Sequence, residues 1–314
     1  MYPSVKQRRK AGNDGGAVKV TLVEVAPRDG LQNESAIVSV ADKIRLVRRS
    51  VDAGVRRIEA VSFVDPRRVP QMAAAEAVMA GVPRGDGVSY AGLIVNERGL
   101  DRALAAGVDE INVVVVATDS FSMRNQGCTT AQGVERWARL AARAREAGLS
   151  RTVTIAAAFG CPFAGEVPEA TVLDLVRRVA EAEPDEIALA DTIGVGTPDR
   201  VRGLAAGAAR IAPDTTLRCH FHNTRNTGYA NAIAALEAGV RVLDTSTGGI
   251  GGCPFAPAAT GNIATEDVLY TLDRMGVETG VRIEPVIETG VWLGELLGKP
   301  APALLGRAGL FPAR

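Results

Sequence analysis

Residues 52–63 read DAGVRRIEAVSF, a helical pattern that ends at Ala-Gly and is followed by a run rich in β-branched residues. The same arrangement returns in AAGVDEINVVVVAT from Ala105, in EAGLSRTVTIAAAF from Glu146 and in EAGVRVLDTSTGG from Glu237. A glycine just past the last helical residue can adopt the left-handed backbone conformation that ends a helix, after which the chain turns away. The repeat therefore predicts helix-to-strand units along much of the chain.

Eight apolar runs of strand length alternate with helical patterns. They span residues 19–27, 56–63, 88–95, 110–117, 152–159, 186–192, 216–223 and 241–247. Most of these runs are apolar throughout instead of alternating, which is typical of parallel strands that are covered by helices. We therefore predict an α/β fold, a TIM (β/α)8 barrel, with a doubly wound open sheet as the alternative.

The length of the chain indicates one large domain. A chain of 314 residues can bury about 75% of its unfolded surface around a single core. Residues 1–17 combine Lys and Arg with Gly and Asn, so we expect a disordered basic tail, although such a tract can also bind nucleic acid or act in targeting. We expect residues 18–314 to form a single catalytic barrel with a C-terminal helical extension.

Charge and cysteine usage narrow the class of protein. Lys and Arg together number 36, as do Asp and Glu, so nothing electrostatic indicates a nucleic-acid or membrane partner. No run approaches the ~20 apolar residues that a membrane span needs. The four cysteines lie far apart without a C-x-x-C pair, and the first residues carry no apolar signal segment. We therefore expect a reduced, cytoplasmic location.

Both histidines of the chain lie in RCHFHNT, residues 218–224. In a β-strand residues i and i+2 face the same way, so the rings of His220 and His222 can reach one object. A single His is often a half-buried residue that satisfies itself with backbone hydrogen bonds. Two of them on one strand face favour a metal site, because imidazole is a common metal ligand.

Polar residues also occur where other predicted strands end. Arg28 and Asp29 follow the first strand, Glu59 lies in the second, and Asp191 ends the sixth. Chemistry in TIM barrels sits at the carboxyl ends of the strands, so we expect these residues at the same rim as the histidines. Taken alone, Asp29 is better explained as a turn residue before Gly30, and the two histidines at the same rim reverse that preference. Two imidazoles, a carboxylate and an Asn amide oxygen favour Mg²⁺ or Mn²⁺ over structural Zn²⁺.

A glycine-rich loop, GGIGGCPFAPAATGN at residues 248–262, follows the eighth strand. Its Cys253 is a candidate proton donor or nucleophile, because a nearby positive charge favours the thiolate. The sequence Gly-Cys-Pro-Phe-Ala occurs a second time around Cys161, so the motif alone does not choose between the two thiols. Glycine density and the nearness of Asn262 favour Cys253. The other two cysteines are expected to be inert small hydrophobes.

Several motifs together resemble those of one family. They are VEVAPRDGLQNE, EAVSFVDPRRVPQM, ADTIGVGTP, the H-x-H pair and GGIGGCPFAPAATGNIATEDVLYTL. They look like the motifs of 3-hydroxy-3-methylglutaryl-CoA lyase, in the metal-dependent lyase and Claisen-synthase superfamily, and they occur in family order over residues 19–295. The resemblance implies a TIM barrel, a divalent cation (Mg²⁺ or Mn²⁺) and a small-molecule acyl-CoA substrate.

The resemblance also implies roles for particular residues. The metal ligands would be Asp29, His220, His222 and Asn262. The catalytic residues would be Arg28 beside the reacting carbonyl, Cys253 on its loop, and His220. The substrate-binding residues would be Arg28, Gln32, Glu59 and Asp191.

Three stretches depart from the family pattern. Residues 223–226 read Asn-Thr-Arg-Asn where family members commonly have Asp-Thr-Tyr-Gly, and Ser35 stands where a Lys is common. Residues 188–190 read Ala-Leu-Ala in place of Ser-Leu-Gly. These changes concern the substrate side more than the metal, so they bear on the choice of substrate more than on the reaction.

The reaction implied is retro-Claisen cleavage of a 3-hydroxyacyl-CoA, in the first place 3-hydroxy-3-methylglutaryl-CoA to acetyl-CoA and acetoacetate. One alternative is a lyase for a related substrate such as citramalyl-CoA. Another is a Claisen-condensing acyl-CoA synthase, although such enzymes lack the Gly-Gly-Cys-Pro loop. A third alternative is a non-catalytic barrel that a metal merely stabilises. Protein ligands would then fill every coordination position of the metal, and the thiol loop would have no purpose. The resemblance leaves a homodimer open as the assembly.

Overall fold

The computed structural model describes residues 18–85, 87–252 and 261–311. Eight parallel strands pair in chain order and close into a barrel, because β1 pairs with both β2 and β8. The strands are β1 (Thr21–Glu24), β2 (Arg57–Ser62), β3 (Ser89–Ile94), β4 (Glu110–Val116), β5 (Ser150–Ala156), β6 (Glu186–Asp191), β7 (Thr216–Phe221) and β8 (Val242–Thr245). The predicted TIM barrel is confirmed, and the open sheet is excluded.

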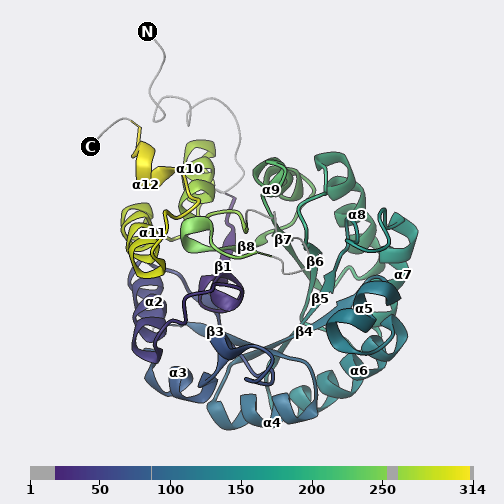
Figure 1. The fold of residues 1–314 in the computed structure, drawn as a ribbon. Helices are drawn as coiled ribbons and strands as arrows, with labels where there is room; N and C mark the ends of the chain where they lie inside the picture. The colour runs from purple at the N-terminus through teal and green to yellow at the C-terminus, as the bar shows by residue number, and fades with distance from the viewer. Residues whose placement is uncertain (1–17, 86, 253–260, 312–314) are drawn as a thin grey trace.

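Helices surround the barrel on its outside (Figure 1). They are α2 (Val40–Asp52), α3 (Ala75–Gly81), α4 (Glu97–Ala106), α5 (Asp119–Gln126), α6 (Thr130–Glu146), α7 (Glu169–Ala180), α8 (Pro198–Ile211), α9 (Gly228–Glu237), α10 (Thr265–Met275), α11 (Ile283–Leu297) and α12 (Leu305–Ala308). Three short helical turns are η1 (Ala26–Gly30), η2 (Pro70–Met72) and η3 (Thr247–Gly249). Within the described residues, no helix is both long and apolar enough to cross a membrane.

The glycines of the repeated Ala-Gly pattern end helices as expected. Gly54, Gly107, Gly148 and Gly239 have φ angles of 105°, 69°, 73° and 95°, a range that L side chains rarely adopt. Each is followed within a few residues by a strand, namely β2, β4, β5 or β8. The repeat in the sequence therefore corresponds to the alternation of helix and strand around the barrel.

The segment after α10 completes the ring of helices. Figure 1 shows α11 between α10 and α2, the helices that stand at the two ends of the barrel sequence. The ring of Trp292 on α11 faces the guanidinium groups of Arg45 and Arg49 on α2, at 5.1 and 5.0 Å. This contact ties the C-terminal helices to the first helix of the barrel.

The barrel interior contains a connected network of charges that the apolar strand patterns do not predict. It joins the guanidinium groups of Arg28, Arg57 and Arg218 to the carboxylates of Asp29, Glu59, Glu110, Glu186 and Asp244. Five carboxylates against three guanidinium groups leave an excess of negative charge within this network. Because buried charge is costly unless it is compensated, the interior favours an additional cation.

Candidate active site

The carboxyl ends of the strands bring most of the predicted residues to one rim. Arg28 and Asp29 lie in η1, a single π-helical turn directly after β1, instead of in an ordinary turn. His220 lies in β7, and His222 stands just beyond the end of that strand. There it forms an isolated backbone bridge with Asn262, which brings Asn262 to the end of β7. The two histidines and the Asn are therefore positioned by the backbone.

Three of these side chains form a cluster with the geometry of a metal site. One ligand atom each from Asp29, His220 and His222 lies within 4.8 Å of the others. The imidazole rings are 5.0 Å apart between centroids and tilted by 50°. The amide of Asn262 adjoins them, because its Nδ2 donates a hydrogen bond to Oδ2 of Asp29 at 2.8 Å. All four predicted metal ligands are thus neighbours.

The donor atoms of this cluster fit a divalent cation. Nδ1 of His222 and Oδ1 of Asn262 are buried, and neither has a hydrogen-bond partner among the described residues. Buried polar atoms are rarely left unpaired in native proteins. Two imidazole nitrogens, a carboxylate oxygen and an amide oxygen are also a donor set that divalent cations accept. The excess of carboxylates in the barrel network points the same way.

The surroundings of Asp29 and His222 favour the protonation states that a cation needs in these two ligands. Burial raises the pKa of Asp29, but the charges of Arg28 and the two histidines outweigh it and hold that pKa well below its usual range. Burial and the charge of His220 lower the pKa of His222 to about 4. Near neutral pH Asp29 is therefore ionised and His222 is neutral, which leaves both with lone pairs to donate.

Asp244 on β8 orients His220. The Nδ1–H group of His220 donates to Oδ2 of Asp244 at 3.0 Å, and Nε2 faces Oδ2 of Asp29 at 4.0 Å. Burial lowers the pKa of His220, but the hydrogen bond to Asp244 and the charges of Asp29 and Asp244 raise it further than burial lowers it. A carboxylate behind a ligand imidazole in this way is common at metal sites, where it fixes the ring and its tautomer.

Arg28 is held at the rim by two carboxylates. Its Nε donates to Oε1 of Glu59 at 2.7 Å, and its Nη1 donates to Oδ1 of Asp29 at 2.8 Å. Glu59 is completely buried, and the Arg28 side chain is only 10% exposed. The guanidinium group is therefore fixed next to the cluster before any ligand binds.

Two predicted substrate-binding residues have other surroundings. Asp191, at the end of β6, accepts hydrogen bonds from the amides of Val195 and Gly196, each at 2.9 Å, and so shapes the loop after β6. Gln32 follows η1 and is half-buried, and its Oε1 has no hydrogen-bond partner in the described part of the chain. Within the described residues, no hydrogen bond joins either side chain to the cluster, so their roles in substrate binding stay predictions.

The comparison with family models identifies the chain. Residues 19–291 match the HMGL-like family model. The chain belongs to the HMGL-like family. The match covers the barrel and most of α11, and it confirms the family that the motifs predict.

Relatives of the HMGL-like chain are similar over nearly its whole length. It is 43% identical over 300 residues to the (R)-citramalyl-CoA lyase of Chloroflexus aurantiacus, covering 92% of this chain and 95% of that protein. It is also 43% identical over 291 residues to the hydroxymethylglutaryl-CoA lyase of Pseudomonas mevalonii, covering 93% and 96%. These relatives confirm the predicted enzyme class, a carbon–carbon lyase.

Solved structures agree with the fold of this HMGL-like chain. The crystal structure of hydroxymethylglutaryl-CoA lyase from Pseudomonas aeruginosa has a TM-score of 0.89 and 41% identity, covering 93% of this chain and 97% of that one. An HMG-CoA lyase from Acinetobacter baumannii, solved with coenzyme A and 3-methylmalate, also has a TM-score of 0.89, with 37% identity and coverage of 94% and 96%.

Of the two Gly-Cys-Pro-Phe-Ala copies in this HMGL-like chain, only the first lies in the described part. Cys161 is buried, and its sulfur lies 3.0 Å from the hydroxyl of Thr118 and accepts from the amides of Phe163 and Ala164. This thiol is held by its own loop and by the segment after β4. Cys253, the predicted catalytic thiol, lies outside the described residues, as does the tail over residues 1–17.

Sequence reasoning missed three polar residues inside the barrel. Asp244 holds His220, Asn112 donates to Oε2 of Glu59 at 3.1 Å, and Arg218 contacts both Glu59 and Asp244. The only signal in the sequence is that each interrupts a strand that is otherwise mostly apolar. Such an interruption indicates an inward-facing polar group but does not say what it contacts.

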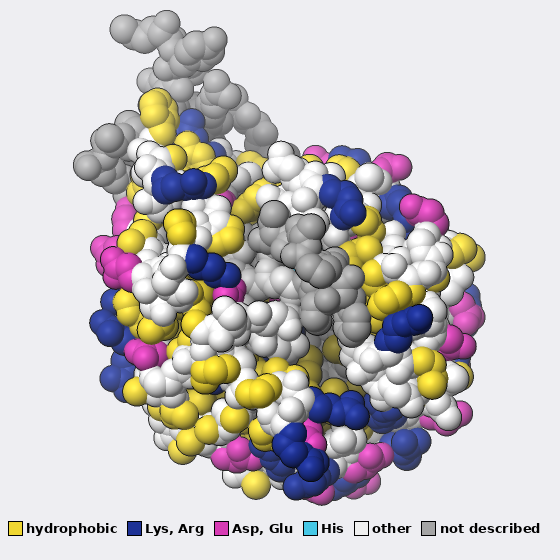
Figure 2. Space-filling view, viewed as in Figure 1, with side chains coloured by type: hydrophobic (Ala, Val, Ile, Leu, Met, Phe, Trp, Pro, Cys, Tyr) yellow, Lys and Arg dark blue, Asp and Glu magenta, His cyan; other side chains and the backbone are white. Residues whose placement is uncertain are grey.

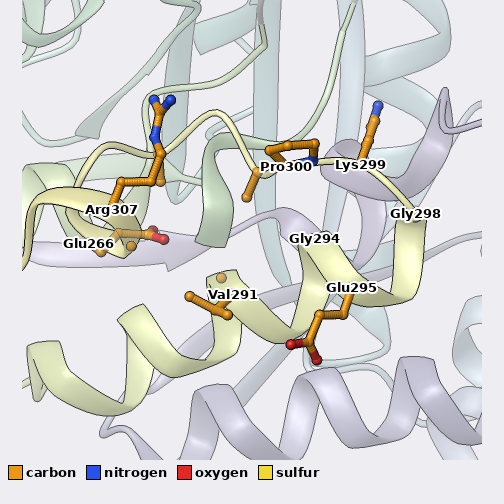
Figure 3. A pocket seen from close by; sticks show the side chains of 12 residues that line it. Glu266, Val291, Gly294, Glu295, Gly298, Lys299, Pro300 and Arg307 are labelled. Carbon is orange, nitrogen blue, oxygen red and sulfur yellow. The ribbon is translucent and has the colours of Figure 1, made fainter.

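A separate cavity of about 420 Å³ lies between α11 and the segment that follows it (Figure 3). Small residues of α11 line one side, and Lys299 and Arg307 lie near its edge. Burial raises the pKa of Glu266, which also lines the cavity, to about 8. None of the four metal-ligand candidates lines this cavity, so it is distinct from the cluster at the rim.

Proposed function

We propose that the protein is a divalent-metal-dependent lyase that breaks the C2–C3 bond of a 3-hydroxyacyl-CoA, with 3-hydroxy-3-methylglutaryl-CoA as substrate and acetyl-CoA and acetoacetate as products. The observation that carries the proposal is the position of Arg28, which is fixed directly beside Asp29 of the cation-binding cluster. A cation and a guanidinium group at adjacent positions can act on the two oxygens that the reaction uses, the 3-hydroxyl and the thioester carbonyl.

The cation would be held by Asp29, His220, His222 and Asn262. We propose Mg²⁺ or Mn²⁺ because this donor set contains no thiolate. When bound, such a cation lowers the pKa of the 3-hydroxyl group and so favours loss of its proton. The protein supplies the orientation: Asp244 fixes the His220 ring, and the backbone bridge between His222 and Asn262 fixes the other two donors.

Cleavage moves an electron pair from the C2–C3 bond toward the thioester. The 3-hydroxyl loses its proton to solvent, C3 becomes the ketone carbon of acetoacetate, and the bonding pair forms the enolate of acetyl-CoA. Arg28 is positioned to stabilise the enolate oxygen, because Glu59 and Asp29 already hold its guanidinium group in a largely buried site. One proton then returns to C2 and completes acetyl-CoA, and Cys253 is our candidate donor.

A substrate panel tests the proposal. The purified protein, supplied with Mg²⁺ or Mn²⁺, is incubated with 3-hydroxy-3-methylglutaryl-CoA and with both enantiomers of citramalyl-CoA, and the products are identified by mass. We expect acetoacetate, with kcat/KM at least roughly tenfold higher than for citramalyl-CoA, because the two acids differ by a methylene group next to the carboxylate. EDTA should remove the activity and added cation should restore it. Turnover that survives EDTA would contradict the metal dependence.

Citramalyl-CoA is the second candidate substrate, because a relative that is 43% identical bears that name. The substrate-side departures bear on this choice of substrate. Arg225 stands where the family commonly has Tyr, and its Nη1 donates to the carbonyls of Ile193 and Gly194, each at 3.1 Å, at the rim between β6 and β7. Pyruvate as the main product of the panel would establish this candidate over the first.

A pair of cysteine variants tests the proton donor. Cys253→Ser should lower kcat by about 10² or more with cation binding unchanged, because a positioned general acid contributes ~10²–10⁴-fold and a serine hydroxyl is a far weaker acid than a thiol. Cys161→Ser is the matched control, since it changes the same atom in the same five-residue motif. It should retain most of the activity. The reverse pattern would assign the proton donor to the loop after β5.

The expected cytoplasmic location and a homodimer are further parts of the proposal. Cell fractionation tests the location, and sedimentation of the purified protein tests the assembly. Residues 18–314 are proposed to form one catalytic domain, which predicts a single cooperative unfolding transition.

A further inference from the structure

Arg218 is a completely buried arginine inside the barrel, two residues before His220 on β7. Alternation along the strand turns residues 218 and 220 to the same side, the barrel interior. The guanidinium group of Arg218 donates hydrogen bonds to carboxylates from three other strands and forms an ion pair at 3.8 Å with Glu110 on a fourth. Its Nε donates to Oδ1 of Asp244, its Nη2 to Oε2 of Glu59 at 3.4 Å, and its Nη1 to Oε1 of Glu186 at 3.4 Å.

Two of these carboxylates divide their oxygens between Arg218 and the active site. Asp244 accepts from Arg218 with Oδ1 and from the His220 ring with Oδ2. Glu59 accepts from Arg218 with Oε2 and from Nε of Arg28 with Oε1. Arg28 in turn donates to Asp29, which faces His220. One guanidinium group therefore lies behind both the imidazole of the cation cluster and the arginine beside it.

We propose that Arg218 is a positioning residue that sets His220 and Arg28 relative to each other, through Asp244 and Glu59. This inference rests on the proposed function of the rim. Without the guanidinium group, two buried carboxylates lose a hydrogen-bond partner and a counter-charge, and each is then free to rotate. Rotation moves the acceptor that fixes a site residue, so cation affinity and catalysis fall together.

Arg57 provides a matched control within the same network. It lies on β2 and pairs with Glu110 at 2.6 Å and with Glu186 at 2.7 Å. In the described part of the chain, no hydrogen bond or ion pair joins Arg57 to Asp244 or Glu59. Loss of its charge should also disturb the barrel interior, but it leaves Asp244 and Glu59 with their partners. A merely structural role for Arg218 therefore predicts that both substitutions lower stability and that neither weakens Mn²⁺ binding more than the other.

The experiment compares Arg218→Gln with Arg57→Gln in the full chain. It measures the melting temperature, the affinity of the free protein for Mn²⁺ by electron paramagnetic resonance, and kcat and KM for the ester that the wild type cleaves. Both variants should melt at lower temperature. Only Arg218→Gln should bind Mn²⁺ about tenfold or more weakly, as is typical when a residue that hydrogen-bonds a metal ligand is lost. Its kcat should fall by a similar factor or more, while its KM stays within about threefold of the wild-type value.

The lysine pair keeps the test decisive if a glutamine variant does not fold. Arg218→Lys restores the charge but not the planar fork, so it should recover part of the Mn²⁺ affinity and kcat while remaining clearly below Arg57→Lys in both. The proposal would be overturned if Arg218→Gln and Arg57→Gln had equal Mn²⁺ affinity and equal kcat. If a glutamine variant does not fold, the same comparison between Arg218→Lys and Arg57→Lys decides. The Mn²⁺ measurement needs no substrate, so it tests the role of Arg218 even if the wild type cleaves none of the esters. Failure of the wild type to cleave any ester would contradict only the proposed function.

Discussion

Replacing His220 or Asp29 with Ala is expected to abolish turnover and to weaken Mn²⁺ binding by roughly 10²-fold or more. Each substitution removes one of four protein ligands from a cation that such sites hold weakly. Its effect on cation affinity should exceed that of losing a residue that only hydrogen-bonds a ligand. A bound cation contributes several kcal/mol to the transition state, so kcat should fall by about 10³ or more. Calorimetry with Mn²⁺ and steady-state kinetics check the two effects.

Cys219→Ala controls for disturbance of the strand in this test. Cys219 lies between Arg218 and His220 on β7, is buried, and by strand alternation faces away from the cluster. Its truncation should lower stability without changing Mn²⁺ affinity. Near-normal turnover with retained cation dependence in either ligand variant would remove that residue from the site.

Arg28→Gln is expected to lower kcat by about 10² or more while Mn²⁺ affinity changes little. This is the usual scale for losing a donor to a developing oxyanion. Cation binding should survive because Asp29 keeps the amide of Asn262 as a partner at 2.8 Å. The fold should survive as well, because Glu59 keeps hydrogen bonds from Asn112 and Arg218.

Arg28→Lys is the matched variant for this prediction. It keeps the charge but cannot reach Glu59 and Asp29 with the same planar geometry, so its kcat should lie between those of Arg28→Gln and the wild type. Comparison of kcat with KM decides the role. If KM alone rose in Arg28→Gln, Arg28 would bind substrate and transition state equally, and its assignment to the enolate would be wrong.

Local sequence patterns were sufficient for the architecture. The Ala-Gly pattern places Gly54, Gly107, Gly148 and Gly239 where helices end, because only a residue without Cβ adopts positive φ at little cost. The strands are shorter than the apolar runs suggest: β7 ends at Phe221, so His222 lies beyond it. A run of apolar residues indicates which residues are buried. Buried residues continue beyond the last residue that is hydrogen-bonded to the neighbouring strand.

Charged side chains on the outer surface give little indication of function, unlike the polar side chains at the rim. Figure 2 shows Lys and Arg interspersed with Asp and Glu around the face it presents, as the equal numbers of the two charge types in the sequence lead one to expect. Mixed solvated charge carries little information on function. The polar residues at strand ends were informative because parallel strands deliver their carboxyl ends to one rim.

The family, the barrel and the chemical types at the rim follow from the sequence by itself, since motifs, glycines and strand ends are local features. What those residues contact was decided only by the closed barrel. Glu59 and Arg218 are 159 positions apart, and their pairing depends on strand tilt and register around the whole barrel. No local pattern encodes that register. The order of contacts from Arg218 through Asp244 to His220, and through Glu59 to Arg28, therefore appears only when eight strands enclose one interior and buried charges must find partners there.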